Sequence, residues 1–210
     1  MCRQYKTVFS YGQAEYDEKR SRFIGQIWNV KDENDAVDKI NQVRQEHREA
    51  RHNVYAYLCR DGSVTGYSDD GEPKGTGGTP ILMLLRGMEL SYVCCVVTRY
   101  FGGILLGTGG LARAYTEAAR LAADNAGICF VKPFSLFKLS FGYDRLELFR
   151  KMTDDLGGQM GQIDYAADIC AEIFIPTENA DIFSKKTAEL SAGSIVPQAV
   201  STVMKKGERL

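Results

Sequence analysis

The amino-acid sequence predicts an α+β protein built from two domains. Its 210 residues suffice for one large domain or two small ones, and 44% of them are hydrophobic, which supports a buried core. Apolar residues recur with a period of two in some stretches and of 3.6 in others, as strands and helices require. The pattern changes at Pro133, so we expect one domain at residues 1–131 and a second at residues 132–210.

The first domain mixes predicted strands with predicted helices. Strands are expected at residues 7–9, 22–28, 54–59, 64–67 and 92–98. Helices are expected after the acidic residues 32–35, at 81–87 behind Pro80, and at 111–124. The pair Asp61-Gly62 predicts a turn between two of these strands.

The second domain has a different order of elements. Alternating apolar residues predict a strand at 137–143, and a helix at 144–156 ends at Gly157-Gly158. Further strands are expected at 159–165, 169–175 and 195–203, with a helix at 177–190 that Thr177 would cap. The order β-α-β-β-α-β is that of a ferredoxin-like split βαβ unit.

Composition excludes several classes of protein. The net charge is −1, so no global field attracts nucleic acid and any polyanion site must be a local patch. No apolar run approaches the roughly 18 residues of a membrane helix, and the first residues lack the layout of a secretory signal. The six cysteines, among them Cys2, form no C-x-x-C motif. We therefore expect a cytoplasmic protein with reduced thiols and no membrane contact.

Residues 98–115 hold a cluster of glycines, arginines and aromatics between a predicted strand and a predicted helix. Clustered glycines indicate backbone at positive φ or backbone that something approaches closely. A glycine-rich helix entry can bind an anion through its free N–H groups, and Thr108 is placed to cap that helix. The candidate anion or nucleic-acid ligands are Arg99, Tyr100, Phe101, Gly102, Gly103, Gly107, Thr108, Gly109, Gly110 and Arg113.

Two observations limit this interpretation. The spacing matches neither a Walker loop nor a dinucleotide fingerprint. Tight packing of the loop, with Arg113 paired to Glu117 one helical turn on, accounts for the same residues without a ligand. Both interpretations remain open from the sequence.

The acidic loop at residues 68–80 is a candidate second patch. Carboxylates at this density suit Mg²⁺ held together with phosphate oxygens, but they also suit a solvated turn that bonds to its own backbone. The members of this patch are His52, Asp69, Asp70, Glu72, Lys74 and Thr76. We expect no cofactor and no dedicated metal site, with Mg²⁺ as the one candidate ion. No arrangement of nucleophile and base is evident, which argues against an enzyme without excluding one.

Both motifs resemble those of the IMPACT/YigZ family. SDDGEPKGTGGTP at residues 68–80 resembles the family loop S-D-D-G-E-P-x-G-T-x-G-x-P. TRYFGGILLGTGGLARAY at residues 98–115 resembles the signature T-R-Y-F-G-G-x-x-L-G-x-G-G-L-x-R-A-Y. The resemblance spans about residues 15–125, and the second domain resembles the smaller C-terminal module of bacterial members.

The resemblance implies a fold and a field of function. It implies an N-terminal βαβ domain of the type shared by a small-subunit ribosomal protein domain, elongation factor G domain IV and GHMP kinases. It also implies a ferredoxin-like C-terminal domain similar to elongation factor G domain V. Eukaryotic relatives act in translational control through a kinase pathway that senses amino-acid starvation. For bacterial members, binding to nucleic acid or ribosomes is the usual suggestion.

Two functions therefore compete. The first is a non-enzymatic, translation-associated or regulatory protein that binds RNA, the ribosome or another polyanion through the loop of glycine, arginine and aromatic residues. The alternative is an enzyme or sensor for a small phosphorylated metabolite or nucleotide. A module that binds proteins through the C-terminal sheet is a third interpretation. Convergence of the 68–80 and 99–113 loops on one cleft would favour the metabolite. The sequence leaves the oligomeric state undetermined.

Overall fold

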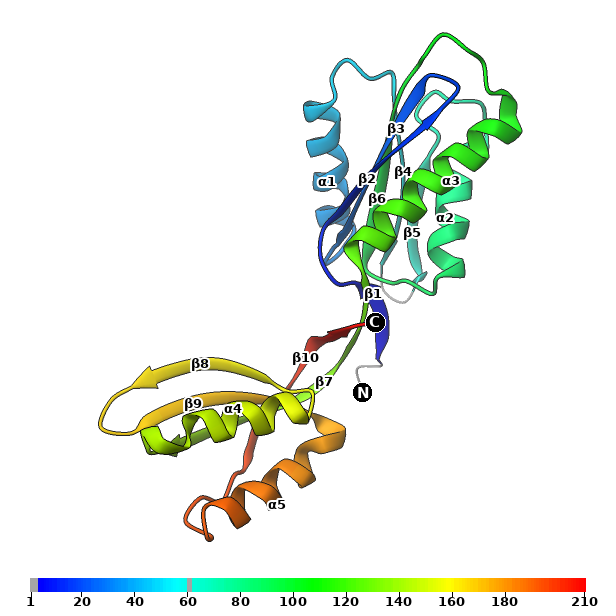
Figure 1. Cartoon of the computed structure of the whole chain (residues 1–210). Coiled ribbons are helices and arrows are strands. Elements are labelled where there is room, and N and C mark those ends of the chain that lie inside the picture. The colour runs from blue at the N-terminus through cyan, green and yellow to red at the C-terminus, as the bar shows by residue number, and fades with distance from the viewer. Residues whose placement is uncertain (1–3, 60–61) are drawn as a thin grey trace. The chain divides into compact units, whose positions relative to one another are not determined.

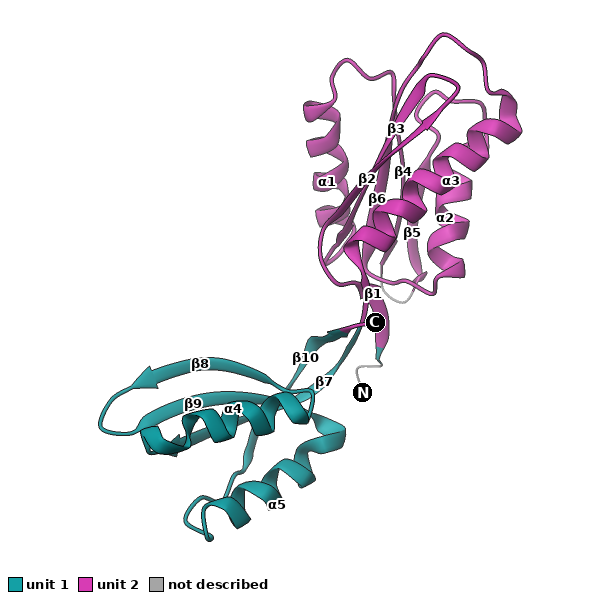
Figure 2. Ribbon diagram, viewed as in Figure 1, with its two compact units in different colours: residues 1–4, 130–208 teal, residues 5–129, 209–210 magenta. Residues whose placement is uncertain are grey.

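The computed structural model of the chain describes residues 4–59 and 62–210, and this part is a mixed α+β structure with two sheets and five helices (Figure 1). Two compact units divide it, Tyr5–Cys129 with Arg209–Leu210, and Phe130–Glu208 (Figure 2). Asp61 of the predicted turn and Cys2 lie outside the described residues. No helix of the described part has the length and apolarity needed to cross a membrane.

The N-terminal unit is organised around a five-stranded sheet with the order β2-β3-β6-β4-β5, in which each pair of neighbours is antiparallel. Its strands are β2 (Gly12–Glu18), β3 (Ser21–Asn29), β4 (His52–Cys59), β5 (Val64–Ser68) and β6 (Val93–Tyr100). A short strand β1 (Tyr5–Val8) precedes them and bridges to Leu90. The central strand β6 is buried on both faces, as its run of apolar residues predicts.

Three helices cover this sheet. The helix α1 (Glu33–Glu46) lies on one face, where it packs on a cluster that includes Cys94 and Val96. The helices α2 (Gly78–Gly87) and α3 (Gly107–Ala126) pack with Cys95 and the rest of the main core on the other face. Burial raises the pKa of both adjacent thiols, that of Cys95 to about 12, which makes these cysteines unreactive core residues.

Close contact between α3 and the sheet explains two glycines in the strands. A Cβ on Gly25 would lie 2.3 Å from the carbonyl oxygen of Ala118, and one on Gly12 would lie 2.2 Å from that of Ala122. The alanine-rich face of α3 therefore lies directly on the backbone of β2 and β3. This packing fixes where the N-terminal end of α3 lies relative to the sheet.

The C-terminal unit has its own core. Its strands are β7 (Ile128–Phe141), β8 (Gln159–Tyr165), β9 (Ile169–Pro176) and β10 (Ala199–Arg209), with β9 between β7 and β8 and with β10 also paired to β7. The helices α4 (Leu146–Asp155) and α5 (Ala180–Leu190) follow the 3₁₀ turns η2 (Tyr143–Arg145) and η3 (Thr177–Asn179). Aromatic pairs fill the core, such as Phe141 on Phe149.

Several predicted boundaries are wrong. Strand β2 was not expected, because its sequence GQAEYDE is mostly polar and only half-buried. Thr177 caps no helix, since it begins a 3₁₀ turn and its hydroxyl accepts a hydrogen bond from Ser135. The last strand covers Ala199–Arg209 instead of residues 195–203. Helix α3 begins at Gly107, so Thr108 lies inside its first turn and makes no cap hydrogen bond.

Candidate functional site

The acidic loop between β5 and α2 begins with Asp69, which caps α2. Its Oδ1 accepts the N–H groups of Gly77 and Gly78 at 2.9 Å each, and its Oδ2 accepts that of Gly75 at 2.7 Å. Burial raises the pKa of this carboxyl, but the three backbone hydrogen bonds together lower it below its ordinary value. The positive end of α2 is thus occupied by a carboxylate of the chain itself.

The glycines of the acidic loop are needed because a side chain would collide with neighbouring atoms or because the backbone has positive φ. A Cβ on Gly78 would lie 2.8 Å from the backbone of Ser68, and one on Gly77 would lie 2.6 Å from the side chain of Val54. Gly71 and Gly75 have φ of +86° and +77°, the left-handed region that favours glycine. These positions let the loop fold back over the start of β4.

Asp70 ties the same loop to β4 and α1. Its Oδ2 accepts the backbone N–H of Asn53 at 2.7 Å, and its Oδ1 accepts the guanidinium of Arg44 at 3.0 Å. Its carbonyl oxygen lies 2.9 Å from Nδ1 of His52. Because a carbonyl oxygen only accepts, Nδ1 carries the proton in the neutral ring and Nε2 is left as the acceptor.

Glu72 joins the acidic loop to the second motif. Its Oε1 accepts Nη1 of Arg99 at 2.7 Å and the hydroxyl of Tyr115 at 2.7 Å, and it lies 3.9 Å from Nε2 of His52. The side chains of Glu72 and Arg99 are only 3% and 6% exposed. Burial, followed by the negative charge of Glu72, raises the pKa of Tyr115 far above its usual range. We call Glu72, Arg99, Tyr115 and His52 the buried network.

The side chain of Arg99 is enclosed by neighbouring residues. Its guanidinium carbon lies 5.6 Å from the ring centre of Phe23 and 5.4 Å from that of Phe101. Its Nη2 approaches the hydroxyl of Ser21 at 3.5 Å, whereas its buried Nε has no hydrogen-bond partner among the described residues. Arg99 therefore neutralises a carboxylate of the chain and does not present its charge to solvent.

The loop between β6 and α3 is held against the β2–β3 turn. The N–H of Gly102 donates to the hydroxyl of Ser21 at 3.2 Å, and a Cβ on Gly102 would lie 1.9 Å from the carbonyl oxygen of Arg20. Gly103 and Gly107 have φ of +86° and +70°. The backbone therefore requires glycine at positions 102, 103 and 107. At Gly109, by contrast, an added Cβ would have only the side chain of Arg113 nearby.

We call one end of the N-terminal unit the loop end: it is where the strands end in the β2–β3 turn, the α1–β4 connection and the 101–106 loop. Strand register brings them together, because Arg22 and His52 pair with Tyr100 and Arg99 respectively. Large apolar side chains of the 101–106 loop stand in solvent there, at 53%, 41% and 82% exposed: Phe101, Ile104 and Leu105.

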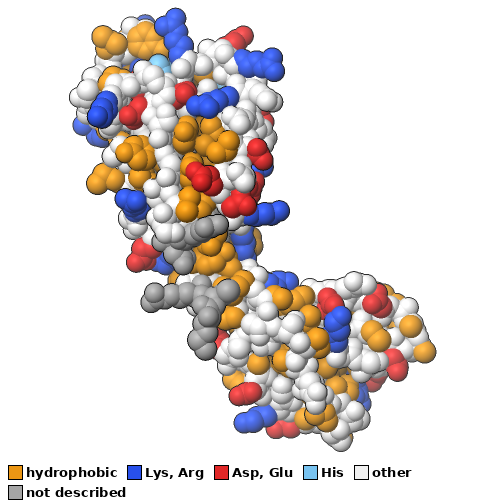
Figure 3. All heavy atoms as spheres, turned by 180° about the vertical axis from the view of Figure 1, so that it is seen from behind, with side chains coloured by type: hydrophobic (Ala, Val, Ile, Leu, Met, Phe, Trp, Pro, Cys, Tyr) orange, Lys and Arg blue, Asp and Glu red, His pale blue; other side chains and the backbone are white. Residues whose placement is uncertain are grey.

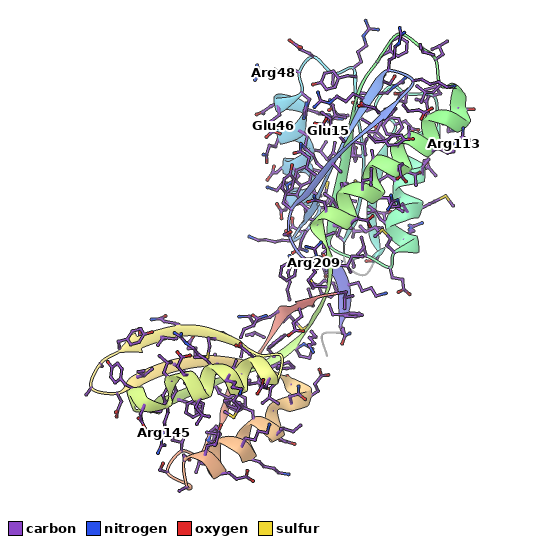
Figure 4. The ribbon with its side chains drawn as sticks, viewed as in Figure 1. Glu15, Glu46, Arg48, Arg113, Arg145 and Arg209 are labelled. Atoms are coloured by element: carbon purple, nitrogen blue, oxygen red, sulfur yellow. The ribbon has the colours of Figure 1, made fainter. Side chains whose placement is uncertain are left out.

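Basic side chains lie at the same end. Arg113, on α3, and Arg48, in the α1–β4 connection, are exposed and make no ion pair with any described residue (Figure 4). The same holds for Arg20 of the β2–β3 turn. Glu117, the alternative partner considered for Arg113, pairs with Arg120 instead. On the face drawn in Figure 3, acidic and basic side chains are interspersed, so this face carries no field of one sign.

The remaining predicted residues lie apart from the buried network. The hydroxyl of Thr76 donates to the carbonyl of Pro73, and Lys74 is exposed. The hydroxyl of Tyr100 lies 2.9 Å from Nδ1 of His47. The described residues hold no group of three or more His, Cys, Asp or Glu able to bind a metal ion.

Two members of the site were missed in the sequence. Tyr115 lies within the helix expected at residues 111–124, and its hydroxyl gives no signal in a pattern of apolar spacing. Ser21 gave no signal either, because its hydrogen bonds to Arg99 and Gly102 depend on how β3 pairs with β6.

Both motif loops lie in a part of the chain that is similar to known proteins. The model of the Impact N-terminal domain matches residues 19–123. An IMPACT family member of Bacillus subtilis, YvyE, is 32% identical over 92% of this chain and 89% of its own length. YigZ of Escherichia coli is 34% identical over 84% of this chain and 88% of its own length. A crystal structure of a hypothetical protein is 31% identical with a TM-score of 0.60, covering 96% of this chain and 99% of that one.

Proposed function

Because the chain belongs to the IMPACT family, we propose that it is a translation-associated regulatory protein that binds RNA at the loop end without catalysing a reaction. The link to translation is supported by the resemblance to eukaryotic relatives that act in translational control. Such a role belongs in the cytoplasm, in keeping with the free thiols of Cys94, Cys95 and Cys170.

One observation carries the RNA-binding part of this proposal. Exposed Phe101, Ile104 and Leu105 lie at the same end of the sheet as the exposed cations Arg20, Arg48 and Arg113. Aromatic rings stack on unpaired bases, and arginines bind phosphates, which is the pairing that single-stranded RNA requires. The buried network supports this surface, since Arg99 packs beneath Phe101 and is itself anchored by Glu72.

The finer fold assignment is part of the proposal. The order β7-α4-β8-β9-α5-β10, with β7 between β9 and β10, supports a ferredoxin-like C-terminal domain similar to elongation factor G domain V. The N-terminal unit is taken to share the fold of elongation factor G domain IV and its relatives. A shared fold does not by itself establish a shared function. RNA binding is therefore argued from the exposed side chains at the loop end.

Fluorescence anisotropy with labelled single-stranded and hairpin RNA at low salt tests the proposal. The double variant Arg20→Ala/Arg113→Ala and the single variant Phe101→Ala should each weaken binding by about tenfold or more. Arg86→Ala is the matched control, because Arg86 is an exposed cation at the opposite end of α2. Equal loss in the control variant, or no RNA binding by the wild-type protein, would reject RNA as the ligand.

A second candidate function has one observation in its favour. The two motif loops do converge, since Glu72 contacts both Arg99 and Tyr115, and convergence favours a site for a small phosphorylated metabolite. Against it, the carboxylates of Asp69, Asp70 and Glu72 already have partners within the chain. A thermal-shift screen with nucleotides and sugar phosphates, with and without Mg²⁺, separates the two functions. Stabilisation by a compound of this class would favour the metabolite.

A further inference from the structure

Strand β2 is an edge of the five-stranded sheet and pairs with β3 alone. The two strands are joined by Lys19 and Arg20, which both have positive φ, at 46° and 66°. Such a two-residue turn makes Glu18 and Ser21 a hydrogen-bonded pair, and the ladder alternates from there. The backbone N–H and C=O groups of Gln13, Glu15 and Asp17 therefore point away from β3.

Nothing in the backbone of β2 blocks this edge. Its seven residues pair in unbroken register with β3, without a bulge or a proline. Natural edges of this length are usually covered, kinked or charged, because an exposed ladder recruits other strands. Here the protection is charge alone, and it comes from the side chains of Glu15 and Asp17.

A groove of about 520 Å³ runs between this edge and α3. Tyr16 and Glu18 contribute the strand side, and α3 supplies the opposite wall with Arg113, Thr116 and Glu117. An edge strand facing a helix across a groove is the arrangement in which extended peptides add to a sheet: the backbone pairs with the edge, and alternate side chains enter the groove.

Charge identifies the occupant. Glu15 pairs with Arg22, and Glu117 pairs with Arg120, whereas Asp17 and Glu18 have no ion-pair partner among the described residues. A second copy of β2 would place like charges opposite one another, and RNA would bring its phosphates against the same acids. Asp17 lies on the exposed face of β2 and Glu18 faces the groove. A lysine or arginine of an added strand would instead pair with one of these carboxylates.

We propose that β2 and α3 form a docking groove for an extended, basic segment of a partner protein, which adds to the sheet as a strand beside β2. This inference goes beyond RNA binding at the loop end. The two surfaces share Arg113 of the groove wall. The inference itself rests on the backbone of Gln13, Glu15 and Asp17, which the RNA proposal does not use.

Synthetic peptides test the groove directly. The probe is a fluorescein-labelled peptide of alternating valine and lysine, seven residues long to match β2. Its counterparts carry glutamate for lysine, or proline at the central position. We expect the lysine peptide to bind at least about tenfold more tightly than either counterpart. Amide resonances of residues 13–18 and 110–117 should shift on binding.

A matched pair of variants isolates the backbone contact. Gln13→Pro removes one outward N–H without changing charge, and Gln13→Ala removes the same exposed side chain but keeps the N–H. The proline variant should weaken the lysine peptide by about fivefold relative to the alanine variant, which is the effect of one hydrogen bond. If Gln13→Pro does not fold, Asp17→Lys/Glu18→Lys replaces it and should reverse the preference toward the glutamate peptide.

Several results would overturn the inference. Equal affinity for the lysine and glutamate peptides would contradict selection of a basic segment. Resonance shifts confined to other elements would show that the peptide does not bind between β2 and α3. A protein that forms dimers through β2 in sedimentation would assign the edge to a different occupant. RNA affinity of the Gln13→Pro protein is measured in parallel and should be unchanged, so the two proposals fail separately.

Discussion

Glu72 is the residue on which both sequence motifs depend. It accepts hydrogen bonds from Arg99 and Tyr115 in the interior, so it needs no external cation. Removing one member of a buried ion pair leaves the other charge uncompensated in a place with little water. The conspicuous arginine of the signature is therefore part of the scaffold, and its variants report on stability before they report on binding.

Arg99→Met keeps most of the side-chain volume and removes the charge. We expect it to lower the free energy of unfolding by about 3–5 kcal/mol, because Glu72 is left buried and unpaired. Urea denaturation followed by circular dichroism measures this loss. The double variant Glu72→Gln/Arg99→Met should recover part of the stability. A single variant within about 1 kcal/mol of wild type would show that the pair is not buried as described.

Asp69 gives stability a defined dependence on pH. Its pKa is lower in the folded protein than in the unfolded chain, so its contribution is present above the unfolded pKa and is lost as pH falls through the folded pKa. Asp69→Asn should cost about 1 kcal/mol at pH 7, and the difference from wild type should shrink in acid. Denaturant titrations at neutral and acid pH measure it; a difference that grows in acid would contradict the cap.

The motifs single out residues whose partners within the chain the sequence does not reveal. Asp69, Glu72 and Arg99 stand out by type and spacing, and the sequence predicts them as candidate ligands of phosphate or Mg²⁺, with packing and hydrogen bonding within the chain as the alternative. The structure shows a pairing within the chain because Glu72 reaches the end of β6, where Arg99 lies. That approach depends on the path of an irregular loop, which no periodicity in the sequence encodes.

At the level of the elements, the segment from the end of β6 into the first turn of α3 contains both glycines that the backbone requires and glycines that it does not require. A Cβ on Gly102 meets the backbone of Arg20, whereas Gly109 faces open space inside the first turn of α3. The close approach at Gly102 locks the loop to the β2–β3 turn. At Gly109 the ordinary entropic cost of glycine in a helix has no compensating contact in the described part of the chain.

Gly102→Ala and Gly109→Ala should therefore have opposite effects. We expect Gly102→Ala to destabilise the protein by roughly 3 kcal/mol, because backbone must move away from the new methyl group. Gly109→Ala should stabilise it by roughly 0.5–1 kcal/mol through helix propensity. Thermal unfolding of the two variants beside wild type provides the comparison. Equal destabilisation by both would mean that Gly109 has a packing role that the structure does not show.

Elements with strong apolar periodicity were the ones that the sequence predicted. The expected strand at residues 92–98 corresponds to β6, and the expected strand at residues 169–175 corresponds to β9, in which buried residues alternate with more exposed ones. Strand β2 was missed because an edge strand with one half-buried face has few apolar residues to reveal it. Helix α3 begins earlier than predicted because packing of its alanine face on the sheet offsets the cost of the glycines in its first turn.

Taken as a whole, the protein carries almost no net charge, and this sets the character of its binding. With a net charge of −1, attraction of RNA must come from a few cations at the loop end against a mixed background. We expect modest affinity that falls with salt, and the fall should reflect only a small number of phosphate contacts. An affinity independent of salt would contradict this description.

The salt dependence of RNA binding shows whether cations at the loop end contact phosphates. Affinity for a labelled single-stranded RNA is measured by anisotropy over a series of salt concentrations, for wild type, Arg113→Ala and Arg86→Ala. The proposal predicts that Arg113→Ala reduces the slope of log affinity against log salt by about 0.7, the effect of one phosphate contact, while Arg86→Ala leaves it unchanged. Identical slopes for all three proteins would contradict RNA binding at the loop end.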